Sequence, residues 1–269
     1  MVKVSLGAGP KEQAGYFAVS GSHLYTVLHA AAEPVARVLL VGPFAWERHS
    51  SYIPWVRWAR YLAARGMECL RYDYRGIGES TGRFEDMSFE DWSEDVQLLA
   101  GWLNARTPAV PLALHGLEMG ALLAGQALAA GIGDALLAWS APGSANEVLR
   151  SALLRRVAVD NMFRYGGQRK GAADYIQKLE TEPVEIEGYQ WTSRLWRDSF
   201  GLELPSGLQE RGSAPAGCGK PLKKVQLGKS AEPLIKGSMY ISINPDLNGL
   251  FADNFSWIAS ALAVQPRSQ

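Results

Sequence analysis

The sequence has few of the residues on which several kinds of function depend. Its 269 residues include two cysteines and four histidines. Two cysteines make a disulfide framework unexpected, and no cluster of cysteine, histidine and carboxylate residues has metal-ligand spacing. Lysine plus arginine and aspartate plus glutamate both number 27, so the net charge is zero, and no overall field would attract nucleic acid or an anionic membrane. We therefore expect no metal, no cofactor and no nucleic-acid partner.

Long apolar segments are also missing. The first residues contain no apolar stretch long enough for a signal peptide. The most apolar region, residues 121–141, is interrupted by Gln126, Gly131, Gly133 and Asp134, which favours a helix followed by a strand over a membrane span. Cys69 lies in an apolar run typical of a core strand, whereas Cys218 lies in a glycine-rich loop. These features predict a cytoplasmic protein without a membrane span.

The order of the predicted elements indicates an α/β protein. Short apolar runs alternate with segments that have apolar residues at helical spacing. This alternation predicts a mostly parallel central sheet flanked by helices. The predicted strands are 16–20, 23–30, 38–41, 68–72, 112–115 and 135–140, and the predicted helices are 52–65, 88–106 and 119–130.

The alternation stops after residue 142. Two helical segments, 147–163 and 171–179, follow one another with no strand between them. We therefore expect residues 143–210 to form a helical cap, and residues 1–142 and 211–269 to form the α/β core. The sheet is predicted to resume weakly near 223–227 and 238–243, before a last helix at about 254–264.

The strongest chemical signal is the segment Leu112 to Ala121, which reads LALHGLEMGA. It predicts a strand, a tight turn with a glycine at each flank, and an alanine- and leucine-rich helix. This is the geometry of the G-x-S-x-G nucleophile elbow, in which small residues let the strand and helix approach closely. Glu118 occupies the position of the serine.

A second motif, Asp73 to Gly82 (DYRGIGESTG), follows a predicted strand. It closely resembles the loop after the fourth strand of α/β-hydrolases, and the two motifs lie the usual distance apart. This resemblance implies the α/β-hydrolase fold. It also implies that the loop from Gly42 to Ala45 (GPFA) supplies part of an oxyanion hole, so that Phe44, Ala45 and Met119 line the site.

A closer resemblance covers residues 36–205. It rests on four segments that look like those of the exosortase-system-associated hydrolases, a group that accompanies bacterial exopolysaccharide and protein-sorting loci. The segments are 42–47 (GPFAWE), 116–124 (GLEMGALLA), 149–158 (LRSALLRRVA) and 184–189 (VEIEGY). The resemblance implies a fold and a genomic neighbourhood more than a reaction.

The sequence departs from the serine–acid–histidine order of α/β-hydrolases. None of its histidines follows the predicted cap. His49 is the most accessible candidate for a catalytic histidine, although a surface position at the start of a helix explains it as well, and His115 is expected to be a core residue. The histidine position falls near Asp246 and Asn248, and the acid position near Lys229 and Glu232. Two of the three triad roles are therefore empty.

Two functions remain open for Glu118. In the first, it is the nucleophile or general base of a hydrolase that acts on a small ester, acyl or sugar-derived substrate under the cap. In the second, the chain is a catalytically inactive pseudo-hydrolase that binds a small molecule as an accessory protein. In either case the backbone amides of Met119 and Phe44, at the start of a helix, favour an ionised Glu118.

The predicted cap is rich in basic and aromatic residues. The basic side chains could recognise an anionic ligand or could form a solvated helix face, and the aromatic side chains could stack on a sugar or pack in the core. The residues concerned are Arg150, Arg155, Arg156, Arg164, Arg169, Lys170, Tyr189, Trp191 and Trp196. The sequence leaves the oligomeric state open.

Overall fold

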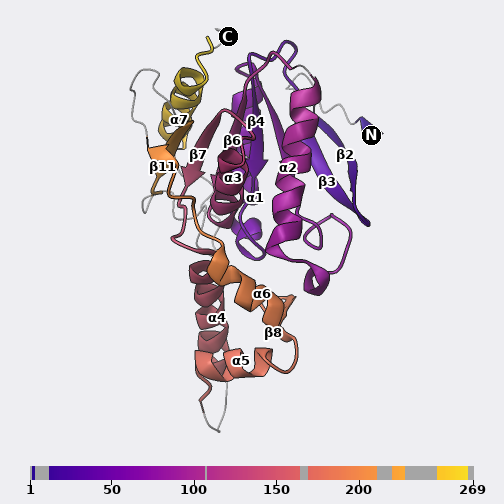
Figure 1. The fold of residues 1–269 in the computed structure, drawn as a ribbon, viewed down its shortest axis with the longest axis vertical. Helices are drawn as coiled ribbons and strands as arrows, with labels where there is room; N and C mark the ends of the chain where they lie inside the picture. The colour runs from indigo at the N-terminus through magenta and orange to yellow at the C-terminus, as the bar shows by residue number, and fades with distance from the viewer. Residues whose placement is uncertain are drawn as a thin grey trace.

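The computed structural model describes residues 2–3, 12–106, 108–163, 169–210, 220–227 and 247–265. Its main feature is a sheet in which the described strands follow the order β1-β2-β3-β5-β4-β6-β7-β11-β10. Figure 1 shows this sheet in the upper part of the molecule. The strands are β1 (Val2–Lys3), β2 (Glu12–Val19), β3 (Ser22–His29), β4 (Ala36–Val41), β5 (Met67–Tyr72), β6 (Leu112–Leu117), β7 (Ala135–Trp139), β10 (Gln209–Glu210) and β11 (Pro221–Val225).

The sheet is mostly parallel, as the alternation of elements predicts. Strands β1, β2 and β3 pair in antiparallel fashion and join β5 antiparallel, whereas every pairing from β5 through β4, β6, β7 and β11 to β10 is parallel. The carboxyl ends of β4, β6 and β7 therefore meet at one edge of the sheet. The loops that follow these three strands lie there together, which is where open α/β sheets place their ligands.

Helices cover both faces of the sheet. Helices α1 (Glu47–Ala63) and α7 (Asn248–Ala261) pack on one face, and α2 (Phe89–Arg106) and α3 (Met119–Ala129) pack on the other. Strand β4 shows why both faces are apolar. Val38 and Leu40 pack on the face covered by α1 and α7, while Leu39 and Val41 pack on the face covered by α2 and α3. Cys69 is buried on the face covered by α1 and α7, which confirms its predicted core position.

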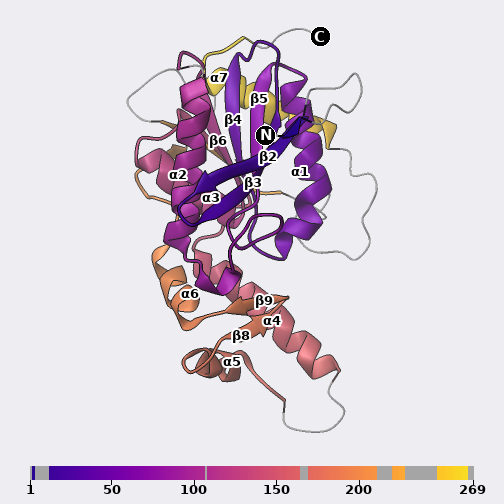
Figure 2. The ribbon, with the colours of Figure 1, turned by 90° about the vertical axis from the view of Figure 1, so that its right-hand side faces the viewer.

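A smaller lobe extends from the carboxyl edge of the sheet. Figures 1 and 2 show it below the sheet, connected through α4 and the segment after α6. Its elements are α4 (Ala145–Met162), α5 (Ala172–Leu179), β8 (Val184–Ile186), β9 (Tyr189–Trp191), α6 (Ser193–Asp198) and the 3-10 helix η2 (Ser199–Gly201). The two connections lie side by side, because the Ala145 amide donates a 2.8 Å hydrogen bond to the Leu202 carbonyl and Ser144 forms a β-bridge with Glu203.

The lobe contains one feature that the sequence-based prediction lacks. Strands β8 and β9 form an antiparallel hairpin whose two turn residues, Glu187 and Gly188, both have positive φ, 52° and 87°. That combination is typical of a tight type I′ hairpin turn. Residues 209–210 also add the short edge strand β10 to the main sheet, so the interval 143–210 is mainly but not wholly helical.

Two helices begin earlier than predicted. Helix α1 starts at Glu47 rather than residue 52, and α7 starts at Asn248 rather than about 254. Glu47 suits the first turn of a helix because its charge opposes the helix dipole. The predicted strand 238–243 and Cys218 lie outside the described residues. Within the residues that are described, no helix has both the length and the apolar character needed to cross a membrane.

Candidate active site

The turn between β6 and α3 has the strained geometry of a nucleophile elbow. Glu118 has φ 50° and ψ −118°, a combination that a residue with a side chain rarely adopts. Its amide donates a 2.9 Å hydrogen bond to the carbonyl of Trp139 on β7, and its carbonyl accepts one of 2.9 Å from the amide of Ala121. These two bonds hold the turn between the neighbouring strand and the first turn of α3, as the sequence predicts.

The two glycines of the motif are required by packing. A Cβ atom on Gly116 would lie 2.2 Å from Cα of Ala121, and one on Gly120 would lie 2.1 Å from the carbonyl oxygen of Val41 and 2.3 Å from that of Gly42. No side chain fits at these distances. Helix α3 therefore packs so closely against β6 and against the end of β4 that only glycine fits at positions 116 and 120.

This close approach brings the loop after β4 beside the elbow. Phe44 and Ala45 are buried, and Ala45 has a positive φ of 43°. The Tyr74 hydroxyl donates a 2.7 Å hydrogen bond to the carbonyl of Gly42 and fixes the start of the loop. Met119, directly after the elbow, is fully buried. The structure thus places the loop, the elbow and the start of α3 together, while their role as donors to an anion remains a prediction.

All four histidines lie in the described part of the chain, and the side-chain hydrogen bonds and ring contacts described for His29, His49 and His115 are with residues other than Glu118. His115 is fully buried behind the elbow, where its Nδ1 accepts a 2.8 Å hydrogen bond from Trp58 Nε1, and burial lowers its pKa well below the ordinary value. His29 is fully buried and accepts a 3.2 Å hydrogen bond at Nε2 from Arg71. His115 is therefore a core histidine, as expected.

His49 lies on the surface in the first turn of α1. Its ring packs on Trp46 with 5.1 Å between centroids, and it lines an open hollow of about 550 Å³ with Tyr25, Tyr52 and Glu79 among its neighbours. Glu118 is not among the described residues that line this hollow. The surface position that the sequence allowed is the one observed, and a catalytic role for His49 gains no support. His23 is also exposed, on β3.

The loop after β5 is held by a buried carboxylate. Arg48 donates two hydrogen bonds to Asp73, 2.8 Å from Nε to Oδ1 and 2.6 Å from Nη2 to Oδ2, and the Glu79 amide donates a third of 2.9 Å. A Cβ atom on Gly78 would lie 2.3 Å from the same Asp73 Oδ2. The motif's aspartate and glycine are thus used for folding the loop, and sequence reasoning did not identify Arg48 as the partner.

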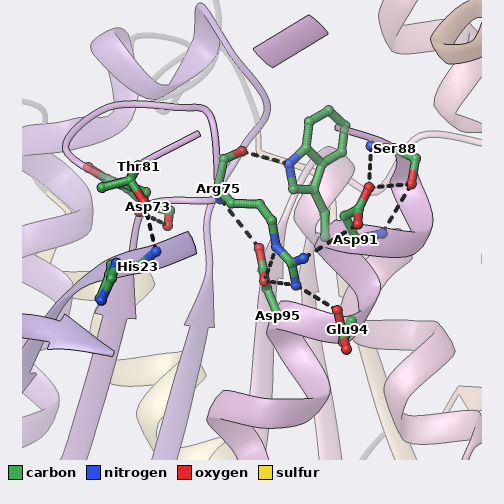
Figure 3. A network of polar contacts seen from close by, with 10 residues as sticks. His23, Asp73, Arg75, Thr81, Ser88, Asp91, Glu94 and Asp95 are labelled. Atoms are coloured by element: carbon green, nitrogen blue, oxygen red, sulfur yellow. Dashed lines mark hydrogen bonds and ion pairs between the residues drawn. The ribbon is translucent and has the colours of Figure 1, made fainter. Parts of the chain in front are cut away.

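The arginine of the same motif is buried in an acidic network on α2. Arg75 donates to Asp95 from Nε at 2.7 Å and contacts Glu94 at 2.8 Å and Asp91 at 3.4 Å, and Figure 3 shows the carboxylates converging on the guanidinium. Burial raises the pKa of Asp95 to about 6, against the lowering effect of the Arg75 charge. The Trp92 indole donates to the Arg75 carbonyl at 3.0 Å. This network ties the loop to α2.

Of the remaining candidates for the histidine and acid positions, only one lies in the described part of the chain. Lys229, Glu232 and Asp246 lie outside the described part of the chain, whereas Asn248 begins α7. Among the residues that are described, no group of three or more histidine, cysteine or carboxylate side chains has the arrangement of a metal site.

Three of the lobe's aromatic side chains take part in packing contacts. Trp191 and Trp196 are buried, and Tyr189 lies against Phe84 of the 3-10 helix η1 (Phe84–Asp86), with 4.8 Å between ring centroids. Two of the lobe's arginines are bound by acids: Arg155 contacts Glu47 and Glu187, and Arg156 contacts Asp160 and Glu185. Arg164 lies outside the described part of the chain.

Comparison with known proteins identifies the fold. Residues 55–149, about a third of the chain, match the model of a family described as serine aminopeptidase, S33. Est1E from Butyrivibrio proteoclasticus, solved with ferulic acid bound, is 17% identical, with 93% of this chain and 100% of that chain covered and a TM-score of 0.62. An assumed hydrolase from Agrobacterium vitis S4 is 15% identical, with 94% and 98% covered and a TM-score of 0.53.

Other similarities are partial. The chain covers 64% of an α/β serine hydrolase without a lid from Xanthomonas campestris, at 21% identity and a TM-score of 0.43, and 51% of this chain takes part. No curated protein matches the sequence. The full-length likenesses, together with the sheet order and the elbow, show that the chain has the α/β-hydrolase fold.

Proposed function

We propose that this α/β-hydrolase-fold chain binds a small ester, acyl or sugar-derived molecule at the elbow beneath the lobe, and that Glu118 is its reactive group. The observation that carries the proposal is the strained φ and ψ of Glu118 at the carboxyl edge of the sheet. Backbone strain of this kind is kept where a side chain must be presented in a particular direction. The lobe, which we propose forms a cap spanning residues 143–210, extends from this edge of the sheet.

A carboxylate at this position acts on carbon electrophiles. In the proposed step, one Glu118 carboxylate oxygen attacks a ring carbon of an epoxide, the carbon–oxygen bond opens, and the resulting alkoxide takes a proton from water. With an ester substrate, the carboxylate can instead act as a base: it takes a proton from water, the water oxygen attacks the ester carbonyl, and the alcohol leaves with that proton. As a nucleophile it would attack the ester carbonyl, form an anhydride at Glu118 and release the alkoxide, which takes a proton from water, before water hydrolyses the anhydride. Phe44, Ala45 and Met119 supply the amides that would stabilise negative charge at the turn.

A second function is favoured by one specific observation. His115 lies behind the elbow, His29 is buried beside Arg71, and His49 and His23 are exposed, so no imidazole serves as the base that α/β-hydrolases use. In this alternative the chain keeps the binding site and acts as an inactive accessory protein. The resemblance to exosortase-associated hydrolases and the cytoplasmic location remain predictions, and the oligomeric state is open.

The deciding experiment is intact-mass spectrometry after incubation with styrene oxide and with p-nitrophenyl acetate, followed by peptide mapping. A nucleophilic Glu118 gives a mass increase equal to one whole styrene oxide, mapped to the peptide containing Glu118. The Glu118→Gln variant, which keeps the shape without the charge, forms no such adduct. Reversible ligand binding without adduct or turnover supports the accessory function. Labelling of any serine by a fluorophosphonate contradicts both functions as stated.

A further inference from the structure

Arg155 joins the lobe to the body of the molecule. It lies on α4, and its guanidinium contacts two carboxylates at once. One is Glu187 in the turn of the lobe's hairpin, reached at 2.6 Å from Nε and 2.9 Å from Nη2. The other is Glu47, the first residue of α1, which Nη2 also contacts. Among the ion pairs between described residues, the contact with Glu47 is the one that connects the lobe to the sheet-bearing body.

Glu47 is a buried carboxylate that needs this partner. Its side chain is only 8% exposed. Burial raises the pKa of Glu47, while the positive charge of Arg155 acts in the opposite direction. A charge removed from water is stable only when it is paired. Glu47 is also tied to the loop after β4, because its amide donates a 3.1 Å hydrogen bond to the carbonyl of Phe44.

The loop after β4 is also connected to the lobe's hairpin through contacts between aromatic rings. The ring of Phe44 lies 5.8 Å from that of Phe84, and Phe84 lies 4.8 Å from Tyr189 on β9. The hairpin is therefore connected to both ends of the segment 44–47. One connection is ionic and runs through Arg155, and the other is aromatic and runs through Phe84.

We propose that the hairpin and the segment 44–47 move as one unit, with Arg155 as the positioning residue that couples them. The position of the lobe then sets where the amides of Phe44 and Ala45 point. Ligand binding at the elbow and closure of the lobe consequently favour one another, because coupling between two sites acts equally in both directions. The coupling of ligand binding to lobe position, called the ligand half of the inference, rests on the proposed function. The coupling of the hairpin to the segment 44–47 concerns the protein without ligand.

The adjacent residue on α4 provides a matched control. Arg156 is also bound by two carboxylates, Asp160 and Glu185, but both belong to the lobe. Arg155→Met therefore removes the ionic link between lobe and body, whereas Arg156→Met removes a comparable pair inside the lobe. Glu47→Gln is a second test variant, since it breaks the link without leaving a buried charge behind.

Lobe position is measured with spin labels at Gln97→Cys on α2 and Gln177→Cys on α5, both exposed sites, in a Cys218→Ser background. Cys69 is fully buried and does not react with the label. Pulsed dipolar spectroscopy on the full chain gives the distance distribution between the labels. We expect one narrow distance in the parent and in Arg156→Met, and a broad, longer distribution in Arg155→Met and Glu47→Gln. Unchanged distributions in both test variants, with folding confirmed by circular dichroism, would overturn the coupling.

The ligand half is tested by the rate at which styrene oxide modifies Glu118. A displaced 44–47 segment slows this reaction by about tenfold or more, because small misplacements of catalytic groups have large effects on rate. The slowing is expected in Glu47→Gln and not in Arg156→Met, and equal slowing in both variants would contradict it. If styrene oxide modifies neither variant nor the parent, the nucleophilic role proposed for Glu118 fails, while the distance measurement still decides the coupling.

Discussion

The packing at the elbow makes a sharp prediction for Gly120→Ala. The added methyl carbon would lie 2.1 Å from the carbonyl oxygen of Val41 and 2.3 Å from that of Gly42, whereas carbon and oxygen normally approach no closer than about 3.3 Å. Both oxygens are backbone atoms at the end of a central strand, so no side chain can turn away. Helix α3 would have to shift by about 1 Å.

That shift is costly because α3 is enclosed. Nine of its eleven residues are buried, and overpacking a close-packed interior costs about 1–3 kcal/mol, sometimes more. We expect Gly120→Ala to lower the free energy of unfolding by about 3 kcal/mol or more. The better helix propensity of alanine recovers less than about 1 kcal/mol of this.

Gly101→Ala is the matched control. Gly101 also lies in a helix, α2, but no atom beyond its chain neighbours and the nearby backbone of that helix lies within 4 Å of its would-be Cβ. Here the helix-propensity gain stands alone, and the variant should be more stable by about 0.5–1 kcal/mol. Urea unfolding followed by circular dichroism measures both variants. If Gly120→Ala unfolds within about 0.5 kcal/mol of the parent, a change usual for harmless surface substitutions, the close approach of α3 to β4 is wrong.

Two further predictions concern buried ionisable groups. Burial, reinforced by the charge of Arg71, lowers the pKa of His29 from 6.5 to about 4. The unfolded chain therefore binds more protons between these values, and the stability that neutral His29 contributes at neutral pH is lost as pH falls from about 6.5 to about 4. This loss is about 3 kcal/mol at most. The free energy of unfolding of His29→Gln should therefore depend less on pH in that window than that of the parent. An equal pH dependence in both proteins would contradict the lowered pKa of His29. Asp95→Asn leaves the buried Arg75 without its closest counter-charge and should destabilise the protein by about 3 kcal/mol in urea unfolding, whereas a neutral effect would mean that the remaining acids satisfy Arg75.

The elbow could be predicted from sequence because its pattern of residues is local, although one of its glycines is required by a neighbouring strand. Gly116 and Gly120 flank Glu118 within a strand–turn–helix pattern, and each glycine is required by atoms a few residues away or by the next strand. The central strands were predictable for a similar reason, since continuous apolar runs are typical of strands buried on both faces.

The side-chain partners could not be predicted in the same way. Arg48 and Asp73 are 25 residues apart, and Arg155 and Glu47 are 108 residues apart. An arginine on a helix has many possible acidic partners, and only the packed fold selects one. The β8–β9 hairpin was missed because its strands have three residues each, too few for alternation to be recognised, and because Glu187-Gly188 is not one of the residue pairs typical of such turns.

The absence of a histidine at the elbow changes what the proposed chemistry would look like. An ester formed at Glu118 is normally removed by water that an imidazole activates. Here His115 is buried behind the turn and held by Trp58, and burial keeps it neutral and enclosed. The first step needs only the carboxylate and a carbon electrophile, whereas the second step lacks its base. An adduct at Glu118 should therefore accumulate to stoichiometric amounts and persist, so a mass measurement on the intact protein detects this chemistry where a turnover assay reports almost none.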